Sequence, residues 1–302
     1  MAIDRLIEAI EAKKNPTVLG LDPQPDYLPP GMLEKHIEEH KATPAALISA
    51  YKEVLFALID ELHDVVPAIK PQSAYFEALG PGGMGLMMMV ILKARAHGLF
   101  VIADAKRGDI GSTSEAYSAA FLGRTAVGDA LYPMFDADAL TVNPYLGSDN
   151  IKPFLKDCEE YDKMVFVLCK TSNPSSFEVQ ELLVEGRPLY RAIAEQVSQS
   201  GRHLEGKYGY LSTAIVAGAT QPDAIRQLRK DHPELFFLVP GYGAQGGKAE
   251  DIAAAFDKDG RGAIVNNSRG ICCAWKKDDT VSYTQAARNA AIAMRDDLMS
   301  AI

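Results

Sequence analysis

Eight short hydrophobic runs recur along the chain, and each ends in polar or glycine-rich residues. The runs are continuously apolar rather than alternating, which is the pattern of parallel strands buried on both faces of a sheet. The pattern therefore predicts eight parallel strands: TVLGLD (17–22), VVPAIKPQ (65–72), LFVIADAK (99–106), ALTVNP (139–144), KMVFVLCK (163–170), STAIVAG (212–218), LFFLVPG (235–241) and AIVNNS (263–268).

Helical periodicity fills most of the segments between these runs, as at 44–64, 82–98 and 221–233. In a chain of 302 residues, eight strands that alternate with helices are most simply arranged as an α/β fold, the (β/α)8 TIM barrel. No linker rich in Pro, Gly or Ser divides the chain, so we predict a single catalytic domain over residues 1–302. A doubly wound open sheet is the main alternative, because strand count alone does not close a barrel.

Two connections are long, namely 22–43 after the first run and 171–209 after the fifth, which includes a helix. Both leave the carboxyl ends of predicted strands, the face on which barrel enzymes carry their chemistry. We therefore expect the functional residues on this side of the barrel.

Composition and charge exclude several classes of partner. Hydrophobic residues make up 47% of the chain, and a net charge of −9 comes from 40 acidic and 31 basic residues without a basic block. This balance argues against nucleic acid or an anionic membrane as the main partner.

The longest apolar stretch, around 84–92, is too short to span a membrane. The first residues place Ile3, Leu6, Ile7 and Ile10 at helical spacing, as in a folded amphipathic helix rather than a signal peptide.

Cysteine and histidine usage indicates neither a metal site nor a histidine base. The four cysteines form no CxxC pair and have no histidine at metal-ligand spacing, so we predict reduced thiols in a cytoplasmic protein: Cys158, Cys169, Cys272 and Cys273. The six histidines fall in helical or loop positions, and we expect surface residues rather than ligands or bases: His36, His40, His63, His97, His203 and His232.

Charged residues gather where the third run ends, in IADAKRGDIGST (102–113). Asp104 and Lys106 are two apart, so in an extended strand their side chains share one face. Asp109 follows beyond the strand end. A structural ion pair followed by a helix cap would account for one such motif. The motif is not alone, however, because other strand ends also carry charge: Lys70, Asp22 and Arg269. With Lys70 and Lys106 as the candidates for proton transfer at the barrel mouth, a lysine acid is the implied chemistry.

A glycine-rich turn follows the seventh run, in VPGYGAQGG (239–247), and precedes the helical pattern KAEDIAAAFD. Backbone amides in such a turn approach an anion closely, and a helix amino terminus adds a favourable dipole. Together with Arg269 beyond the eighth run, the turn predicts the phosphate site that barrels build from their seventh and eighth loops. After the fifth run, the position of Ser172 and Asn173 just before Pro174 predicts that they form a turn.

DAKRGDIGST, together with AIKPQ, GLDPQ, PGYGAQGG and NNSRGI, resembles the orotidine 5′-phosphate decarboxylase family, and is similar to its bacterial branch with longer loops (type 2). The resemblance covers nearly the whole chain. It implies cofactor-independent and metal-free decarboxylation of orotidine 5′-monophosphate to uridine 5′-monophosphate and CO₂, the final step of de novo UMP synthesis.

The resemblance also implies site residues. The charged catalytic array falls on Lys70, Asp104, Lys106 and Asp109. Asp109 and Thr113 would reach the ligand of a neighbouring subunit, which implies a homodimer. The remaining substrate contacts would be Asp22 and Lys70 on the ribose, Ser172 on the pyrimidine instead of a turn role alone, and Gln245, Arg269 and the amides near Gly246 and Gly270 on the phosphate. The roles of the two long connections stay open.

Three other functions remain as alternatives. A sugar-phosphate lyase or decarboxylase of the same barrel group uses DxKxxD to hold Mg²⁺ and an enediolate, but those relatives usually carry an acid where this chain has Lys70. A non-catalytic nucleotide-phosphate binder would keep the glycine-rich turn and Arg269 but would not need Lys106. A Schiff-base aldolase would use a lysine on a keto substrate.

Overall fold

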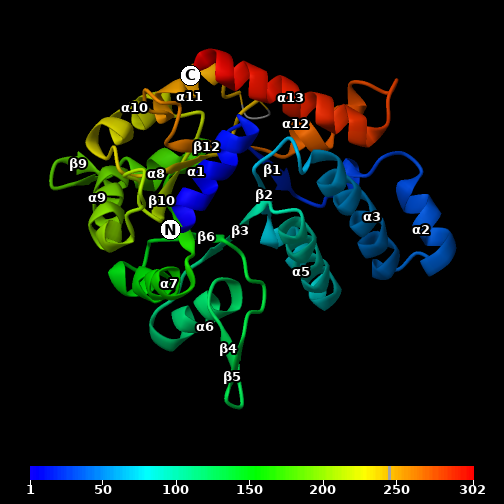
Figure 1. Cartoon of the computed structure of the whole chain (residues 1–302), viewed down its shortest axis with the longest axis horizontal. Helices are drawn as coiled ribbons and strands as arrows, with labels where there is room; N and C mark the ends of the chain where they lie inside the picture. Colours follow the sequence, from blue (N-terminus) through cyan, green and yellow to red (C-terminus); the bar gives the residue numbers. More distant parts are fainter. Residues whose placement is uncertain (244–245) are drawn as a thin grey trace.

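A computed structural model of the chain describes residues 1–243 and 246–302, and within them eight parallel strands close into a barrel (Figure 1). The first strand pairs with both the last and the second, so the barrel is confirmed and the open sheet is excluded. Each predicted hydrophobic run contains one barrel strand: β1 (Thr17–Leu21), β2 (Ala68–Pro71), β3 (Phe100–Arg107), β6 (Ala139–Val142), β7 (Met164–Lys170), β10 (Thr213–Ala217), β11 (Phe237–Val239) and β12 (Ala263–Asn267).

Helices surround the barrel and cover the outer faces of its strands (Figure 1). The longer helices are α1 (Ala2–Lys13), α3 (Pro44–Leu62), α5 (Gly80–Ala96), α6 (Gly111–Phe121), α7 (Ser148–Tyr161), α9 (Leu189–Gly201), α10 (Pro222–Asp231) and α13 (Tyr283–Ala301). The shorter ones are α2 (Met32–His40), α4 (Ser73–Glu77), α8 (Phe177–Gln180), α11 (Ala249–Ile252) and α12 (Arg269–Cys272). No helix of the described residues is long and apolar enough to cross a membrane.

The barrel interior is filled by apolar side chains, and α1 closes its amino end. Ile3, Leu6 and Ile7 of α1 are buried in one cluster with strand residues such as Phe166 and Ile264. The predicted amphipathic helix is therefore confirmed, and its apolar face is the floor of the barrel. A closed floor leaves the opposite, carboxyl end of the strands for ligand binding.

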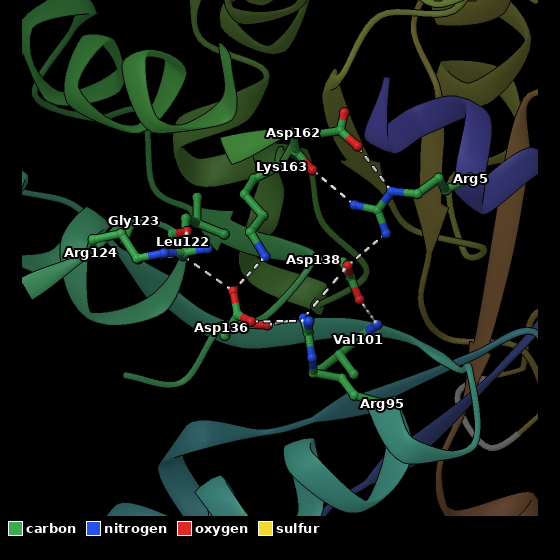
Figure 2. Close-up of polar contacts among 10 residues, drawn as sticks. All are labelled: Arg5, Arg95, Val101, Leu122, Gly123, Arg124, Asp136, Asp138, Asp162 and Lys163. Carbon is green, nitrogen blue, oxygen red and sulfur yellow. Dashed lines mark hydrogen bonds and ion pairs between the residues drawn. The ribbon is translucent and has the colours of Figure 1, made fainter. Parts of the chain in front are cut away.

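Charged side chains on one side of this floor form what we call the amino-end network (Figure 2): Arg5, Arg95, Arg124, Asp136, Asp138, Asp162 and Lys163. Asp138 accepts hydrogen bonds from Arg5 Nη1 at 2.8 Å and from the backbone N–H of Val101 at 2.9 Å. Arg5 also donates to the side chain of Asp162 at 3.0 Å and to its backbone carbonyl at 2.8 Å. These bonds attach α1 to the loops that enter β6 and β7, and Asp138 in turn to β3.

The connections contain elements that the hydrophobic pattern did not predict. The 22–43 connection forms a 3₁₀ turn at Pro25–Tyr27 and α2, and the 171–209 connection adds α8 and the hairpin of β8 (Leu183–Val184) and β9 (Arg187–Pro188) before α9. A second hairpin, β4 (Thr125–Val127) and β5 (Ala130–Tyr132), projects from the body of the molecule (Figure 1). The helix expected after the glycine-rich turn is only α11, continued by a 3₁₀ turn at Ala253–Ala255.

Candidate active site

Asp104 is the centre of a hydrogen-bonded group at the carboxyl end of β3, which we call the mouth cluster: Lys70, Gln72, Asp104, Lys106 and Thr141. Asp104 Oδ2 accepts from Lys70 Nζ at 2.6 Å, and Asp104 Oδ1 accepts from Lys106 Nζ at 2.6 Å. The ends of β2, β3 and β6 supply these side chains, because neighbouring parallel strands end at the same rim. The structure thus brings together three of the residues predicted to be catalytic.

Lys106 reaches Asp104 through an irregular backbone rather than through the regular pleat of a strand. Its φ angle is 49°, in the left-handed region, and the pairing of β3 with β6 shifts register between Ala103 and Arg107. The Lys106 N–H donates to Thr141 Oγ1 at 2.9 Å, and that hydroxyl donates to Asp104 Oδ1 at 2.9 Å. The predicted contact is present, but its expected cause, two side chains on one face of an extended strand, is wrong. Backbone strain at such a residue is typical of functional sites.

The mouth cluster is charged although it is largely buried. Burial disfavours the carboxylate of Asp104, but Lys70 and Lys106 outweigh burial and hold the pKa of Asp104 far below its usual range. Burial likewise opposes the ammonium of Lys70, whose pKa is nevertheless raised by Asp104 and Asp22. The Lys106 side chain is 46% exposed, against 5% for Lys70. Lys106 is therefore the ammonium group that a ligand can contact.

A cavity of about 200 Å³ lies beside the cluster, between the ends of β1, β11 and β12. Asp22 and Tyr75 line it and also act on the charge of Lys70, so the cavity and the cluster adjoin. Asp22 Oδ1 is buried and has no hydrogen-bond partner among the described residues. A buried oxygen without a donor is costly unless a ligand satisfies it. The cavity lining consists of Asp22, Gln24, Tyr27, Tyr75, Pro240, Gly241, Tyr242, Asn266, Asn267, Ser268 and Arg269.

Of the residues predicted to bind phosphate, Arg269 lines this cavity. Arg269 is exposed at the start of α12, beside the phenol of Tyr27, which raises the pKa of Arg269. The Gly270 N–H donates to Asn267 Oδ1 at 2.9 Å, and the Gly246 N–H donates to the Gly243 carbonyl at 2.9 Å. Of the groups predicted to bind phosphate, the Arg269 side chain is therefore open to an anion. The backbone amides of Gly246 and Gly270 already donate hydrogen bonds within the chain. Gln245 lies outside the described residues.

Asp109 and Thr113 lie on the rim rather than in the mouth cluster. The Asp109 carboxylate accepts from the N–H of Ile110 at 2.8 Å, and the Asp109 N–H donates to Asn150 Oδ1 at 3.0 Å. Thr113 is exposed in the first turn of α6. The structure therefore does not join these two residues to Lys106 within one chain.

Ser172 follows β7 and packs directly against Gly218, the residue after β10. A Cβ at Gly218 would lie 2.7 Å from the Ser172 nitrogen, so only glycine allows this approach. Asn173 then opens a 3₁₀ turn, with its carbonyl accepting from the Ser176 N–H at 3.1 Å, which confirms the turn predicted from spacing. The half-buried Ser172 side chain lies at the mouth side of the barrel, one residue beyond Thr171.

Some residues of the site were missed in the sequence. Gln72 and Thr141 both hydrogen-bond Asp104, and each had a signal: Gln72 is two residues after Lys70, and Thr141 is the polar residue of an otherwise apolar run. Lys170, also overlooked, is buried at the end of β7 and donates to Glu181 Oε1 at 2.6 Å. The expectation of surface histidines is wrong for His36 and His232, which are buried.

Comparisons with known proteins agree on one family. Residues 18–282 match the family described as orotidine 5′-phosphate decarboxylase / HUMPS. The chain is 41% identical to an orotidine 5′-phosphate decarboxylase of Rhodopirellula baltica over 93% of each chain, and 38% identical to one of Caldicellulosiruptor bescii over 99% of this chain and 98% of that protein. The structure of Leishmania donovani OMP decarboxylase superposes with a TM-score of 0.73 and 33% identity, over 99% of this chain and 98% of the other.

Proposed function

Because the chain belongs to the orotidine 5′-phosphate decarboxylase / HUMPS family, we propose that it decarboxylates orotidine 5′-monophosphate to uridine 5′-monophosphate and CO₂, the last step of UMP biosynthesis. The observation that carries the proposal is the mouth cluster, in which two ammonium groups hold both oxygens of Asp104 beside a cavity that ends at Arg269. The chemistry of the reaction requires such an arrangement of charge.

Loss of CO₂ from C6 of the pyrimidine leaves a carbanion in the plane of the ring. The Lys106 ammonium, placed beside C6, stabilises this developing charge and then delivers the proton that forms the product. Asp104 lies near the departing carboxylate. Repulsion between two unit charges at about 4 Å is worth only about 1 kcal/mol in water and about 4 kcal/mol at an effective dielectric of 20. Since enzymes supply roughly 8–23 kcal/mol, preorganised charge at C6 and binding at the phosphate contribute most.

The nucleotide would extend from the mouth cluster to Arg269. Asp22, with its unpartnered buried oxygen, and Lys70 would bind the ribose hydroxyls, and Ser172 would hydrogen-bond the pyrimidine. Arg269 would bind the phosphate, with Gln245 and the amides of Gly246 and Gly270. Interactions at this remote phosphate accelerate the reaction because they position C6 against Lys106.

We further propose a homodimer in which Asp109 and Thr113 complete the site of the partner subunit. Exposed apolar side chains near the rim support a contact there: Ile110, Tyr145 and Leu146. The two long connections support placement in the branch with longer loops, and four buried free cysteines support a cytoplasmic location.

Mixing two variants, each inactive by itself, tests the shared active site of the dimer directly. Asp109→Ala and Lys106→Ala should each be inactive, but a mixture that exchanges subunits should regain about one quarter of the wild-type activity, because half of the dimers then carry one intact site. A mixture that exchanges subunits and stays inactive would show that Asp109 acts within its own chain.

The metal-dependent alternative fits the mouth cluster less well. Mg²⁺ needs carboxylate oxygens that are free to coordinate it, whereas both oxygens of Asp104 accept hydrogen bonds from ammonium groups. A Schiff-base aldolase needs a neutral lysine, and the pKa of Lys70 is raised.

A spectrophotometric assay with orotidine 5′-monophosphate in excess EDTA tests the proposed function. We expect turnover at the same rate with and without chelator. Turnover only with added Mg²⁺ would favour the sugar-phosphate lyase, a borohydride-trapped keto adduct would favour the aldolase, and tight binding of uridine 5′-monophosphate without any turnover would favour the non-catalytic binder.

A further inference from the structure

Helix α2, in the first long connection, carries two histidines and a glutamate on one face, in the order His-Ile-Glu-Glu-His. One ring nitrogen each of His36 and His40 and one carboxylate oxygen of Glu39 all lie within 4.8 Å of one another. The two imidazole rings are parallel, with an interplanar angle of 3° and centroids 6.4 Å apart. Spacing of three and four residues places such donors on the same side of a helix, where they can share an ion.

The hydrogen bonding of His36 leaves one of its two ring nitrogens without a partner among the described residues. Its side chain is 8% exposed, and Nε2 lies 2.9 Å from Glu53 Oε2 on the neighbouring helix α3. A carboxylate at that distance holds the proton on Nε2, so Nδ1 carries a lone pair. Nδ1 is buried and has no hydrogen-bond partner among the described residues. Histidines that bind metals typically donate their other ring N–H to a carboxylate in this way.

The surroundings favour a cation. α2 contains three glutamates and one lysine, and His40 is its last residue, where the helix dipole places partial negative charge. Lys35 donates to both oxygens of Glu53 at 2.7 Å, which fixes the carboxylate that orients His36. The group lies on the outer helices α2 and α3, away from the mouth cluster (Figure 1).

We propose that His36, Glu39 and His40 bind a first-row divalent transition metal such as Zn²⁺, with Nδ1 of His36 as a ligand and Glu53 as the carboxylate that positions it. Imidazole and carboxylate are suitable ligands for such ions. The bound ion would brace α2 against α3 and would take no part in decarboxylation.

Calorimetric titration of the untagged, chelator-treated full chain with ZnCl₂ tests the site. We expect one ion per chain and a rise in the melting temperature when the ion binds. His40→Ala, at a position whose side chain is 33% exposed, should weaken Zn²⁺ binding at least tenfold. Glu53→Gln should weaken it by about 10–100-fold while leaving every ligand in place.

His97→Ala is the matched control, because His97 Nε2 also lies 2.8 Å from a carboxylate, Asp60 Oδ1, but among the described residues His97 belongs to no group of three metal-ligating side chains. It should leave Zn²⁺ affinity unchanged. The proposal is overturned if wild-type protein does not bind Zn²⁺, if His40→Ala binds it as tightly as wild type, or if His97→Ala abolishes binding. Equal affinity of Glu53→Gln and wild type would overturn the positioning role of Glu53.

Discussion

The two ends of the barrel each carry a group of linked charges, but the groups are built differently. In the amino-end network, the charges bond to backbone as well as to each other: Asp138 accepts from Val101 N–H, and Arg5 donates to the Asp162 carbonyl. In the mouth cluster, Asp104 is held mainly by other side chains, those of Lys70, Gln72, Lys106 and Thr141, and the neighbouring Asp22 has a buried oxygen without a partner among the described residues.

This difference separates charges that are tied to backbone from charges that meet mainly through side chains beside a cavity. Hydrogen bonds to backbone tie the charges of the amino-end network to the fold, as Asp138 does with the Val101 N–H. A cluster beside a buried oxygen that lacks a donor costs stability, and such costs are typical of functional sites. Charge at the end of a barrel is therefore a poor guide to function until its hydrogen bonds are known.

Lys106→Ala should give the largest effect. We expect decarboxylation to fall at least about 10⁴-fold, because in the proposed mechanism the side chain both stabilises the carbanion and supplies its proton. The melting temperature should change little, since Asp104 keeps Lys70 as its partner. Steady-state kinetics measures the loss of turnover, and thermal unfolding of the same preparation measures the melting temperature. Near-normal turnover would show that the mouth cluster is no more catalytic than the amino-end network.

Asp104→Asn should destabilise the fold as well as abolish activity. The substitution leaves the buried ammonium of Lys70 without its closest carboxylate, and breaking a buried pair in this way costs about 3–5 kcal/mol. Urea unfolding at neutral pH measures the loss. If the variant proves as stable as wild type, Lys70 is neutral in the folded protein.

Asp138→Ala at the amino end should reduce stability without changing the kinetics of the folded enzyme. It leaves the Val101 N–H unsatisfied and removes a partner of Arg5, at a cost of about 2 kcal/mol. Urea unfolding and kcat per folded molecule are the measurements. A drop in kcat comparable to that of Lys106→Ala would contradict a purely structural role for this end.

Acid should weaken the amino-end network through Asp136. Burial opposes its ionisation, but Lys163, Arg95 and Arg124 lower the pKa of Asp136 below its ordinary value. A carboxyl group with a lowered folded pKa contributes stability that is present above its unfolded pKa, about 3.9, and is lost as the pH falls further.

The free energy of unfolding should therefore decline between about pH 5 and pH 2. In Asp136→Asn, which keeps a side chain tolerant of the left-handed φ of 53°, we expect a shallower decline. Urea titrations at several acidic pH values compare the slopes, and equal slopes would show that Asp136 does not contribute.

Arg226→Ala should give the smallest effect, at most about 0.5 kcal/mol. Arg226 pairs with Asp223 on the exposed face of α10, three residues away and in neither group. Thermal unfolding and the decarboxylation assay should both match wild type. A loss as large as that of Asp138→Ala would mean that any ion pair on this protein stabilises it to the same degree.

Much of the fold could be predicted from local pattern. Each hydrophobic run became a barrel strand because continuous apolar sequence cannot be exposed on either face of a sheet. The hairpins β4–β5 and β8–β9 were not predicted, because their strands are two or three residues long and largely exposed. Short exposed elements leave no hydrophobic period to detect.

The sequence by itself determined the eight strands and the presence of Asp104, Lys106 and Lys70 at strand ends. Only the tertiary structure decided that Lys70, 34 residues from Asp104, and Thr141, 37 residues away, meet at one carboxylate. It also decided that Lys106 turns into the left-handed region and that His36 is buried against Glu53. Local pattern reports burial and periodicity along one segment, whereas these contacts depend on which segments the closed barrel makes neighbours.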